Sequence, residues 1–381
     1  MEWVFWTAVA LILYIYAGYP ALLVVLHLTR KPRLVRQKNI EPPVSLIISA
    51  YNEEKVIEKK IRNSLELDYP PDKLEIIVVS DASTDRTDDI VKRYMPQGVR
   101  LVRMPERSGK TVGLNHVVPH ANGEIIVFSD ANALYDRQAI RKLVRNFADP
   151  RVGVVTGESR YIVEEGDAST YNENLYWRYE LMIKRLESKL GSLVGGDGAI
   201  YAIRRDLYQP MKPSDLSDFV NPLQIVAKGY RNVYEPEAFS YEKGGESFEK
   251  EFTRKVRIVN RAWRGIISMH QVLNPFRYGF FAIQAISHKV LRWWVPAFMA
   301  IALLANLLIL HRHPVYVATM VMQGAFYSLA LVGFIQRHQE KMRRFFYIPY
   351  YFCLVNWASL RGILENYSGK TYTVWDTVRE K

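Results

Sequence analysis

The chain has 381 residues, 49% of them apolar, and a formal net charge of +12 at pH 7. Its one cysteine, Cys353, excludes an intramolecular disulfide and argues against catalysis by a thiolate. Many of the cations flank apolar segments near the two ends of the chain, which favours contact with anionic lipid headgroups over binding of nucleic acid.

The first apolar segment runs from Trp3 to Leu26, 24 residues without a charge. At about 1.5 Å per residue it is long enough to cross a hydrocarbon core of about 30 Å. It is longer than the apolar core of a cleaved signal peptide, so residues 1–28 are predicted to form a retained transmembrane anchor. Five cations and no acid lie between residues 30 and 38, and the positive-inside rule therefore places the following region in the cytoplasm.

Residues 39–265 are predicted to form one α/β domain with a mostly parallel sheet, because apolar runs alternate there with helical patterns. Asn52 is predicted to cap the helix after the first strand. Asp81 follows the second strand, at the same strand-end position that Asp130 occupies one βα unit later. Two such carboxylates converge at the carboxyl edge of a parallel sheet, where open α/β folds bind nucleotides.

After the third predicted strand, Gly109-Lys110-Thr111 resembles the end of a phosphate-binding loop. Met104 stands where that motif has its first glycine, so a true P-loop is excluded. A Gly-Lys pair at a helix start still offers backbone N–H donors and one cation to a phosphate. A solvated turn is the alternative and carries nearly equal weight.

The apolar run from Ile125 to Phe128 predicts a strand buried on both faces, and it leads into Asp130 and Asn132. A carboxylate at this strand end can bind a hard cation that bridges the oxygens of a diphosphate. The alternative is a cap for a helix over residues 136–147, since Asp and Asn both serve that role. The stretch alone does not separate these two interpretations.

Two more acids are candidates for chemistry. Asp197 lies in the glycine-rich turn 195–199, where a carboxylate has little reason to be present for packing. Asp218 precedes an amphipathic helix and is either its N-cap or a general base that takes a proton from an acceptor hydroxyl.

Five cations lie within residues 254–264. Arg257, Arg261 and Arg264 share one face of the predicted helix, because they are spaced by four and three residues, and this arrangement suits neutralisation of a leaving diphosphate. A solvated helix face or a lipid contact is the alternative.

The C-terminal third adds further apolar segments. Residues 266–290 are predicted to lie at the membrane interface. Residues 291–366 contain two uncharged runs of 18 and 23 residues, which predict a helical hairpin. The segment 345–360 that follows either spans the bilayer or lies at its interface, and residues 367–381 form a tail.

The order of these motifs resembles the membrane-bound family 2 glycosyltransferases of GT-A fold, in the branch that contains cellulose, chitin-oligosaccharide and hyaluronan synthases. The resemblance covers the chain from about Val44 onward. Its motifs are the loop 50–54, Asp81, Gly109-Lys110, 130–132, 196–199, Asp218 and the Arg/Trp cluster 257–264. It implies a Rossmann-like GT-A domain, a nucleotide-sugar donor, a divalent cation (Mg²⁺ or Mn²⁺) and inversion of the anomeric centre by one in-line attack.

The resemblance also implies a role for each matching residue. Six residues would hold the nucleotide or lie near the donor: Tyr51, Glu53, Asp81, Gly109, Lys110 and Asn132. Asp130 would hold the metal, and Asp218 would be the base. Five residues would contact the sugar, the acceptor or the diphosphate: Asp197, Trp263, Arg257, Arg261 and Arg264.

The sequence departs from the family pattern at two places. The family's Asp-x-Asp is here Asp-Ala-Asn, so Asn132 offers only a neutral carbonyl oxygen to a metal or a ribose. The Gln-x-x-Arg-Trp of the processive enzymes is replaced by residues 260–264, in which Trp and Arg occur in reversed order. Addition of one or a few sugars therefore remains open beside polymer extrusion.

These observations predict a multi-pass protein of the plasma (inner) membrane with a cytoplasmic catalytic domain. It would be an inverting glycosyltransferase that moves a sugar from a nucleotide-diphospho-sugar, with a UDP-sugar favoured, to a polysaccharide or lipid-linked saccharide. A non-catalytic membrane scaffold of a polysaccharide synthesis or export complex is the alternative. The sequence leaves the oligomeric state open.

Overall fold

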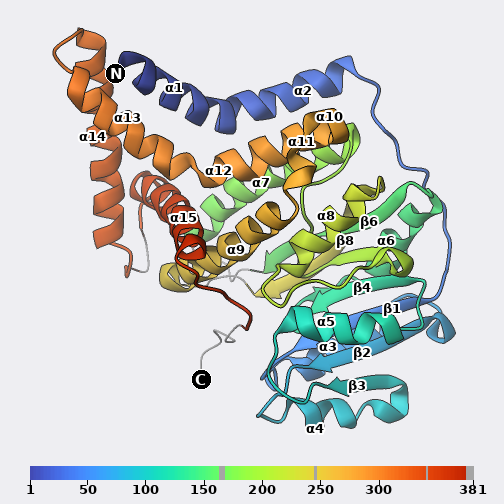
Figure 1. Cartoon of the computed structure of the whole chain (residues 1–381). Helices are drawn as coiled ribbons and strands as arrows, with labels where there is room; N and C mark the ends of the chain where they lie inside the picture. The colour runs from blue at the N-terminus through green and yellow to red at the C-terminus, as the bar shows by residue number, and fades with distance from the viewer. Residues whose placement is uncertain (163–167, 244–246, 340–341, 375–381) are drawn as a thin grey trace.

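The computed structural model of the chain describes residues 1–162, 168–243, 247–339 and 342–374. Its centre, within this part of the chain, is an eight-stranded sheet in the order β3-β2-β1-β4-β7-β6-β8-β5. The strands are β1 (Val44–Ala50), β2 (Leu74–Ser80), β3 (Val99–Arg103), β4 (Ile125–Asp130), β5 (Leu134–Tyr135), β6 (Val152–Ile162), β7 (Tyr201–Arg204) and β8 (Arg231–Lys243). Figure 1 shows the apolar helices gathered on one side of this sheet domain.

The first half of the sheet, β3-β2-β1-β4, is parallel throughout. Both faces are covered, because Leu46 lies in one hydrophobic cluster and Ile47 in a cluster on the other face. This two-sided burial explains the continuous apolar runs in the sequence. The register pairs Ala50 with Ser80 and Ser49 with Asp130, so the ends of β2 and β4 meet at one edge, as predicted.

The second half of the sheet is mixed. Strand β7 is antiparallel to β4 and to β6, β6 is parallel to β8, and β5 is antiparallel to β8. The sequence predicts only short strands near 152–156 and 232–234, whereas β6 has 11 residues and β8 has 13. Register shifts interrupt the β6–β8 ladder, and polar residues occupy its later part, so the apolar pattern fades before the strands end.

The helices of the domain begin and end as follows: α3 (Ile57–Leu65), α4 (Thr87–Lys92), α5 (Lys110–Val117), α6 (Ala139–Val144), α7 (Ala168–Leu190), α8 (Ser217–Ala227) and α9 (Phe248–Ser268). The prediction that Asn52 caps the first of them is wrong. Asn52 adopts a left-handed φ of 52°, and Val56 is the residue that precedes α3. The Asn52 side chain instead accepts a hydrogen bond from the Thr84 amide at 2.8 Å, which joins the loops after β1 and β2.

Within the described residues, two helices are long and apolar enough to cross a membrane. One spans residues 2–29 and consists of α1 (Glu2–Leu13), the π-helical turn η1 (Tyr14–Gly18) and α2 (Tyr19–Thr29). The other is α14 (Pro314–Ile335). A third is possible only if residues 280–293 and α13 (Val295–Ile309), which meet at a bend of 59°, count as one span.

The predicted helical hairpin is therefore only partly matched, since α13 has 15 residues, whereas the first uncharged run has 18. The last helix, α15 (Arg344–Tyr367), packs along α9 of the domain and is not one of the two candidate spans in the described chain. A Cβ added at Gly362 of α15 would lie 2.7 Å from the Val256 carbonyl oxygen of α9, so the two helices cross in close contact.

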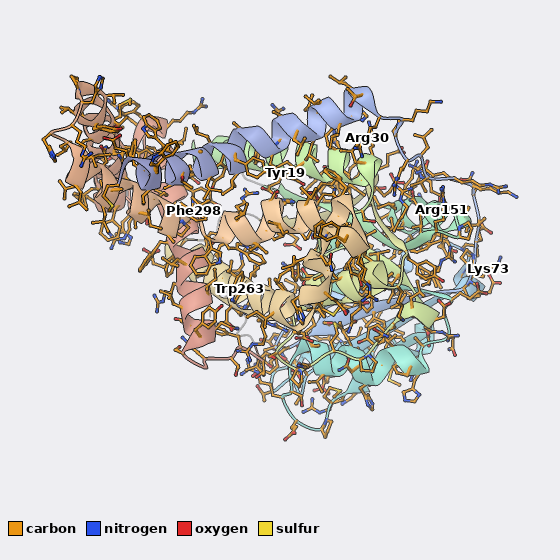
Figure 2. All side chains as sticks on the ribbon, turned by 45° about the horizontal axis from the view of Figure 1, so that its top comes forward. Tyr19, Arg30, Lys73, Arg151, Trp263 and Phe298 are labelled. Carbon is orange, nitrogen blue, oxygen red and sulfur yellow. The ribbon has the colours of Figure 1, made fainter. Side chains whose placement is uncertain are left out.

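The N-terminal helix also docks on the domain. Tyr19, labelled in Figure 2, and Leu23 of α2 pack against Ile183 of α7. The Tyr19 hydroxyl donates to Glu187 at 2.5 Å. His288, from the π-helical turn η8 (Ile286–Val290), bridges Glu187 and Glu180 through its two ring nitrogens. The apolar helices and the sheet domain are therefore joined by buried polar contacts as well as by apolar packing.

Candidate active site

Asp81 organises the loop that leads into α5. Its buried carboxylate accepts hydrogen bonds from the backbone amides of Ser108 at 2.8 Å and Gly109 at 2.9 Å. Gly109 has a φ of 93°, and a Cβ at this position would collide with the Thr373 carbonyl oxygen. The segment near the end of the described chain therefore lies directly against this loop, and both the turn and the close contact require glycine.

Tyr51 and Glu53 lie on the neighbouring loop after β1. The Arg107 guanidinium is 4.0 Å from the centre of the Tyr51 ring, a cation–π contact. Glu53 is buried, and its backbone amide donates to the Thr87 hydroxyl at 2.7 Å. The loops after β1, β2 and β3 are thus tied together at the carboxyl edge of the parallel strands.

Asp130, at the end of β4, forms an ion pair with Lys110, the first residue of α5, at 2.5 Å. The Lys110 ammonium also donates to the Gly198 carbonyl at 3.3 Å, which connects α5 to the glycine-rich turn. The interpretation of Asp130 and Asn132 as caps of the next helix is wrong, because β5 intervenes and α6 starts only at Ala139.

Asp218 and the glycine-rich turn are in contact. A Cβ added at Gly198 would lie 3.1 Å from a carboxylate oxygen of Asp218, and the Gly196 amide donates to the Asp218 carbonyl at 2.6 Å. Helix α8 starts at Ser217 with Leu216 as its N-cap residue, so Asp218 lies in the first turn and is not the cap. The Asp218 side chain therefore does not cap α8.

Asp197, in the same turn, accepts a hydrogen bond from the Ser159 hydroxyl at 2.7 Å and lies 3.5 Å from the Lys184 ammonium of α7. Lys184 was not singled out from the sequence, because one cation on a long helix has no distinguishing pattern. It links the acid of the turn to the helix on which the N-terminal apolar segment docks.

Proximity of these groups shifts their protonation. Burial raises the pKa of Asp218, and the charges of Asp130 and Asp197 add to the effect while Lys110 opposes it. Glu242, near the end of β8, has its pKa raised to about 7 by burial and by the same two aspartates. A carboxyl with a raised pKa holds its proton more readily, which suits a group that accepts one during a reaction.

Lys60 of α3 lies beneath these acids. It is fully buried, donates to the Ala133 carbonyl at 2.5 Å and lies 3.8 Å from the centre of the Tyr135 ring. Burial lowers its pKa to about 7, although Asp130 and Glu242 partly counteract this. The sequence did not point to Lys60, because it lies in a run of charged residues, although its spacing of three from Ile57 places it on the buried face of α3. It did not point to Glu242 either, because that residue lies in a polar segment without apolar alternation.

The predicted arginine face divides into different environments. Arg261 is buried and donates to the Thr111 hydroxyl at 3.0 Å and to the Ser214 carbonyl at 3.2 Å, which ties α9 to the start of α5. Burial lowers its pKa to about 10, and the nearby Asp218 and Arg257 also affect it. The Nε of Arg264 is buried without a hydrogen-bond partner among the described residues.

Trp263, on the same helix α9, packs against the apolar helices. It packs with Trp293, Trp294 and Ile363 in a cluster between α9 and the apolar helices. The structure thus brings Asp81, Lys110, Asp130, Asp197, Asp218 and Arg261 into one connected region, and it places Trp263 in the contact with the apolar helices. The pocket role of Trp263 stays a prediction.

The sheet is parallel in β3-β2-β1-β4 and mixed in its second half, and this fold is shared with structural neighbours of GT-A fold. Residues 45–210 match the family profile described as Glycosyl transferase family 2. Residues 45–210 therefore have the sequence of a family 2 glycosyltransferase domain.

Curated relatives carry related names. The chain is 29% identical over 227 residues to the probable glycosyltransferase YdaM of Bacillus subtilis, a match covering 57% of this chain and 54% of that protein. It is 26% identical over 204 residues to the poly-β-1,6-N-acetyl-D-glucosamine synthase of Staphylococcus aureus, covering 52% and 49%. A β-monoglucosyldiacylglycerol synthase of Synechocystis is 37% identical over 119 residues, 30% of this chain and 25% of that protein. The matches span about half the length of the first two relatives.

Among solved structures, the mannosyltransferase PcManGT from Pyrobaculum calidifontis, in complex with GDP-Man and Mn²⁺, is similar with a TM-score of 0.74. The match covers 96% of this chain and 99% of that one at 24% identity. It shows that the two chains share their fold, including the part outside the sheet domain.

Proposed function

We propose that the protein is a membrane-anchored, inverting glycosyltransferase that moves a hexosyl or N-acetylhexosaminyl group from a nucleoside-diphospho-sugar to a polysaccharide or lipid-linked saccharide. The observation that carries the proposal is the joining of strand-end Asp81 and Asp130 to Asp218 and Asp197 through Lys110 and the glycine-rich turn. UDP-sugars are the first donors to test. GDP-mannose is the second, because the structural neighbour was solved with it.

The two groups of residues would divide the work. Tyr51, Glu53 and Asp81 would hold the nucleoside, since their loops meet at the carboxyl edge of the parallel strands. Four cations would neutralise the diphosphate: Lys110, Arg257, Arg261 and Arg264. The hydrogen bond from Arg261 to Thr111, the neighbour of Lys110, supports a shared diphosphate region.

The fold family implies a divalent cation, and the residues here fit one. Asp130 offers a partly exposed carboxylate that already stabilises a positive charge, the Lys110 ammonium at 2.5 Å, and Asn132 offers an amide oxygen two residues on. Both are donors that a hard cation prefers. The described residues include no group of three His, Cys, Asp or Glu side chains that could hold a metal, so diphosphate oxygens would share the coordination. A bound cation would neutralise the leaving diphosphate.

The chemistry would be a single displacement. The Asp218 carboxylate takes the proton from the acceptor hydroxyl while that oxygen forms a bond to the anomeric carbon of the donor. The bond from this carbon to the diphosphate oxygen breaks, and the nucleoside diphosphate leaves on the opposite face with the electron pair. Attack and departure on opposite faces invert the anomeric centre, and Asp197 would position the sugar between them.

We propose further that α1–α2 and α14 cross the plasma (inner) membrane and that the sheet domain, residues 39–265, lies in the cytoplasm. The length and composition of these helices support spanning, and the five cations at residues 30–38 support the orientation. The short helices α10 (Pro275–Tyr278) and α11 (Phe280–Ala285) would lie at the interface within residues 266–290, with residues 291–366 as the membrane region. Part of the tail, residues 375–381, lies outside the described residues.

The proposal is tested with the full chain purified in detergent and incubated with Mn²⁺ or Mg²⁺, an acceptor extract and single donors. We expect one donor to release its nucleoside diphosphate and to give a product whose mass increases by one sugar residue or a few. Asp218→Asn should lower the rate of release by about 10²- to 10⁴-fold. Asp206→Asn, at an exposed position, is the matched control and should behave as wild type.

Absence of nucleotide release from every donor, together with an unchanged Asp218→Asn variant, would reject the proposal in favour of a non-catalytic scaffold. The acids argue against that alternative, because a scaffold does not need several carboxylates held at one edge of the sheet at a cost in electrostatic repulsion.

A further inference from the structure

The proposed cation site has one acid fewer than the family pattern. Asp130 is the acid of the strand end, and the second acidic position is Asn132, which carries no charge. A divalent cation between Asp130 and a diphosphate would therefore meet only one carboxylate from this turn. The remaining question is whether another part of the fold supplies the missing charge.

Strand β8 approaches this turn from the other side. Leu134 pairs with Tyr241 and Tyr135 with Ser240 in an antiparallel ladder. In such a ladder one residue forward on one strand faces one residue backward on the other, so continuing the register places Glu242 opposite Ala133. Glu242 thus lies opposite the residue that follows Asn132, although 110 residues of chain separate Asn132 from Glu242.

The charges around Glu242 belong to the proposed site. Asp130, Asp197, Lys110 and Arg254 are all close enough to affect its protonation. Lys60, which donates to the Ala133 carbonyl beneath the same turn, is influenced by Asp130 and Glu242 together. Glu242 therefore shares one electrostatic environment with the strand-end aspartate.

The Glu242 side chain differs in its interactions from another acid of β8. Within the described part of the chain its carboxylate forms neither a hydrogen bond nor an ion pair, although it is more than half buried. Glu237 of the same strand differs, because it is exposed and pairs with Lys142 and Arg145, each at 2.8 Å. A carboxylate that is more than half buried in the field of other acids is electrostatically costly unless a cation lies near it.

We propose that Glu242 supplies, from β8, the second negative charge that Asn132 does not provide, and that it faces the divalent cation of the donor complex. The inference rests on the proposed function and adds to it a residue that positions the cation. The cation would thus face one acid from β4, Asp130, and one from β8, Glu242, in place of two acids from the same turn.

The test measures binding of Mn²⁺ to the full chain by electron paramagnetic resonance, without and with UDP or GDP, so turnover is not the readout. Glu242→Gln should weaken Mn²⁺ binding about tenfold or more, since a carboxylate ligand is replaced by a neutral amide. Glu237→Gln is the matched control and should bind as wild type. The double variant Asn132→Asp/Glu242→Gln returns the second charge to the turn and should recover binding to within about threefold of wild type.

The outcomes separate this inference from the proposed function. Lack of Mn²⁺ binding by wild type with either nucleotide would overturn both the proposed cation site and this inference. Normal wild-type binding with an unchanged Glu242→Gln variant would overturn this inference alone. A loss that Asn132→Asp does not restore in a folded double variant would also overturn it, since the role of Glu242 would then not be its charge.

If Glu242→Gln does not fold, Asn132→Asp in the wild-type chain answers the same question. Because the inference holds that two charges are already present, a third should change Mn²⁺ affinity less than about threefold. A gain of about tenfold or more would show that Asp130 was the sole charge and would overturn the inference.

Discussion

The two halves of the sheet hold their candidate residues by different means. In the parallel half, β1 to β4, the loops are fixed by hydrogen bonds to backbone groups, such as Asp81 to the amides of Ser108 and Gly109. In the mixed half, β6 to β8, Asp218 and Glu242 have their pKa raised by burial and by neighbouring acids. In the proposed function, the first half would bind the donor and the second half would take the proton from the acceptor.

The largest expected effect lies where the halves meet. Asp130→Ala removes the partner of Lys110 and the proposed metal ligand together, so we expect turnover to fall by about 10³-fold or more. Asn132→Ala should only weaken donor or metal binding by a few fold. Initial rates of nucleotide release at saturating donor measure both. Near-normal activity in both variants would contradict the proposed role of Asp130 as a metal ligand.

The second prediction separates the halves kinetically. Asp81→Asn should raise the donor KM by about tenfold with a smaller change in kcat, because the loop at Ser108 and Gly109 loses a charge-assisted acceptor. Asp218→Asn should show the reverse, a large fall in kcat with the donor KM retained. Steady-state kinetics with the identified donor check the pattern, and the same split in both variants would contradict the division of labour.

The smallest effect concerns Lys60, which lies beneath both halves. Its pKa is about 7 in the fold, well below its ordinary value of 10.5, so between these pH values the unfolded chain binds the extra proton. Stability of the wild type should therefore rise with pH from about 7 to 10. Lys60→Met removes the titrating group, and its stability should rise less over that range.

Apparent melting temperatures of both proteins at pH 7 and pH 9, in one detergent, measure the difference. Lys59→Met, one position earlier in α3 and exposed, is the control for loss of a lysine. Parallel pH dependence of the Lys60→Met and wild-type proteins would mean that Lys60 is charged in the fold.

The sequence predicted the parallel half well because strands buried on both faces appear as apolar runs, and the polar residue that ends each run marks the carboxyl edge. Asp81 and Asp130 were found in this way. The roles of all the candidate residues remain predictions. The helical cap assigned to Asn52 was wrong, because its side chain bonds to the neighbouring loop across the edge of the sheet.

The mixed half was harder to predict from sequence. Long strands with Ser159, Ser240 and Glu242 in their later parts do not show apolar alternation, and register between distant strands is not local information. Hydropathy likewise left residues 345–360 open between span and interface. In the structure this segment belongs to α15, which packs against α9. Its hydropathy alone does not predict that packing partner.

The contact between Gly109 and Thr373 has a practical consequence. It brings a chain segment more than 250 residues away against the loop proposed to hold the donor. Val374, next to Thr373, is partly buried there, and Cys353 is the one native thiol. In a Cys353→Ser background, a fluorophore on a cysteine introduced at Val374 would serve as an optical reporter of occupancy at that loop, readable without turnover and before the acceptor is known.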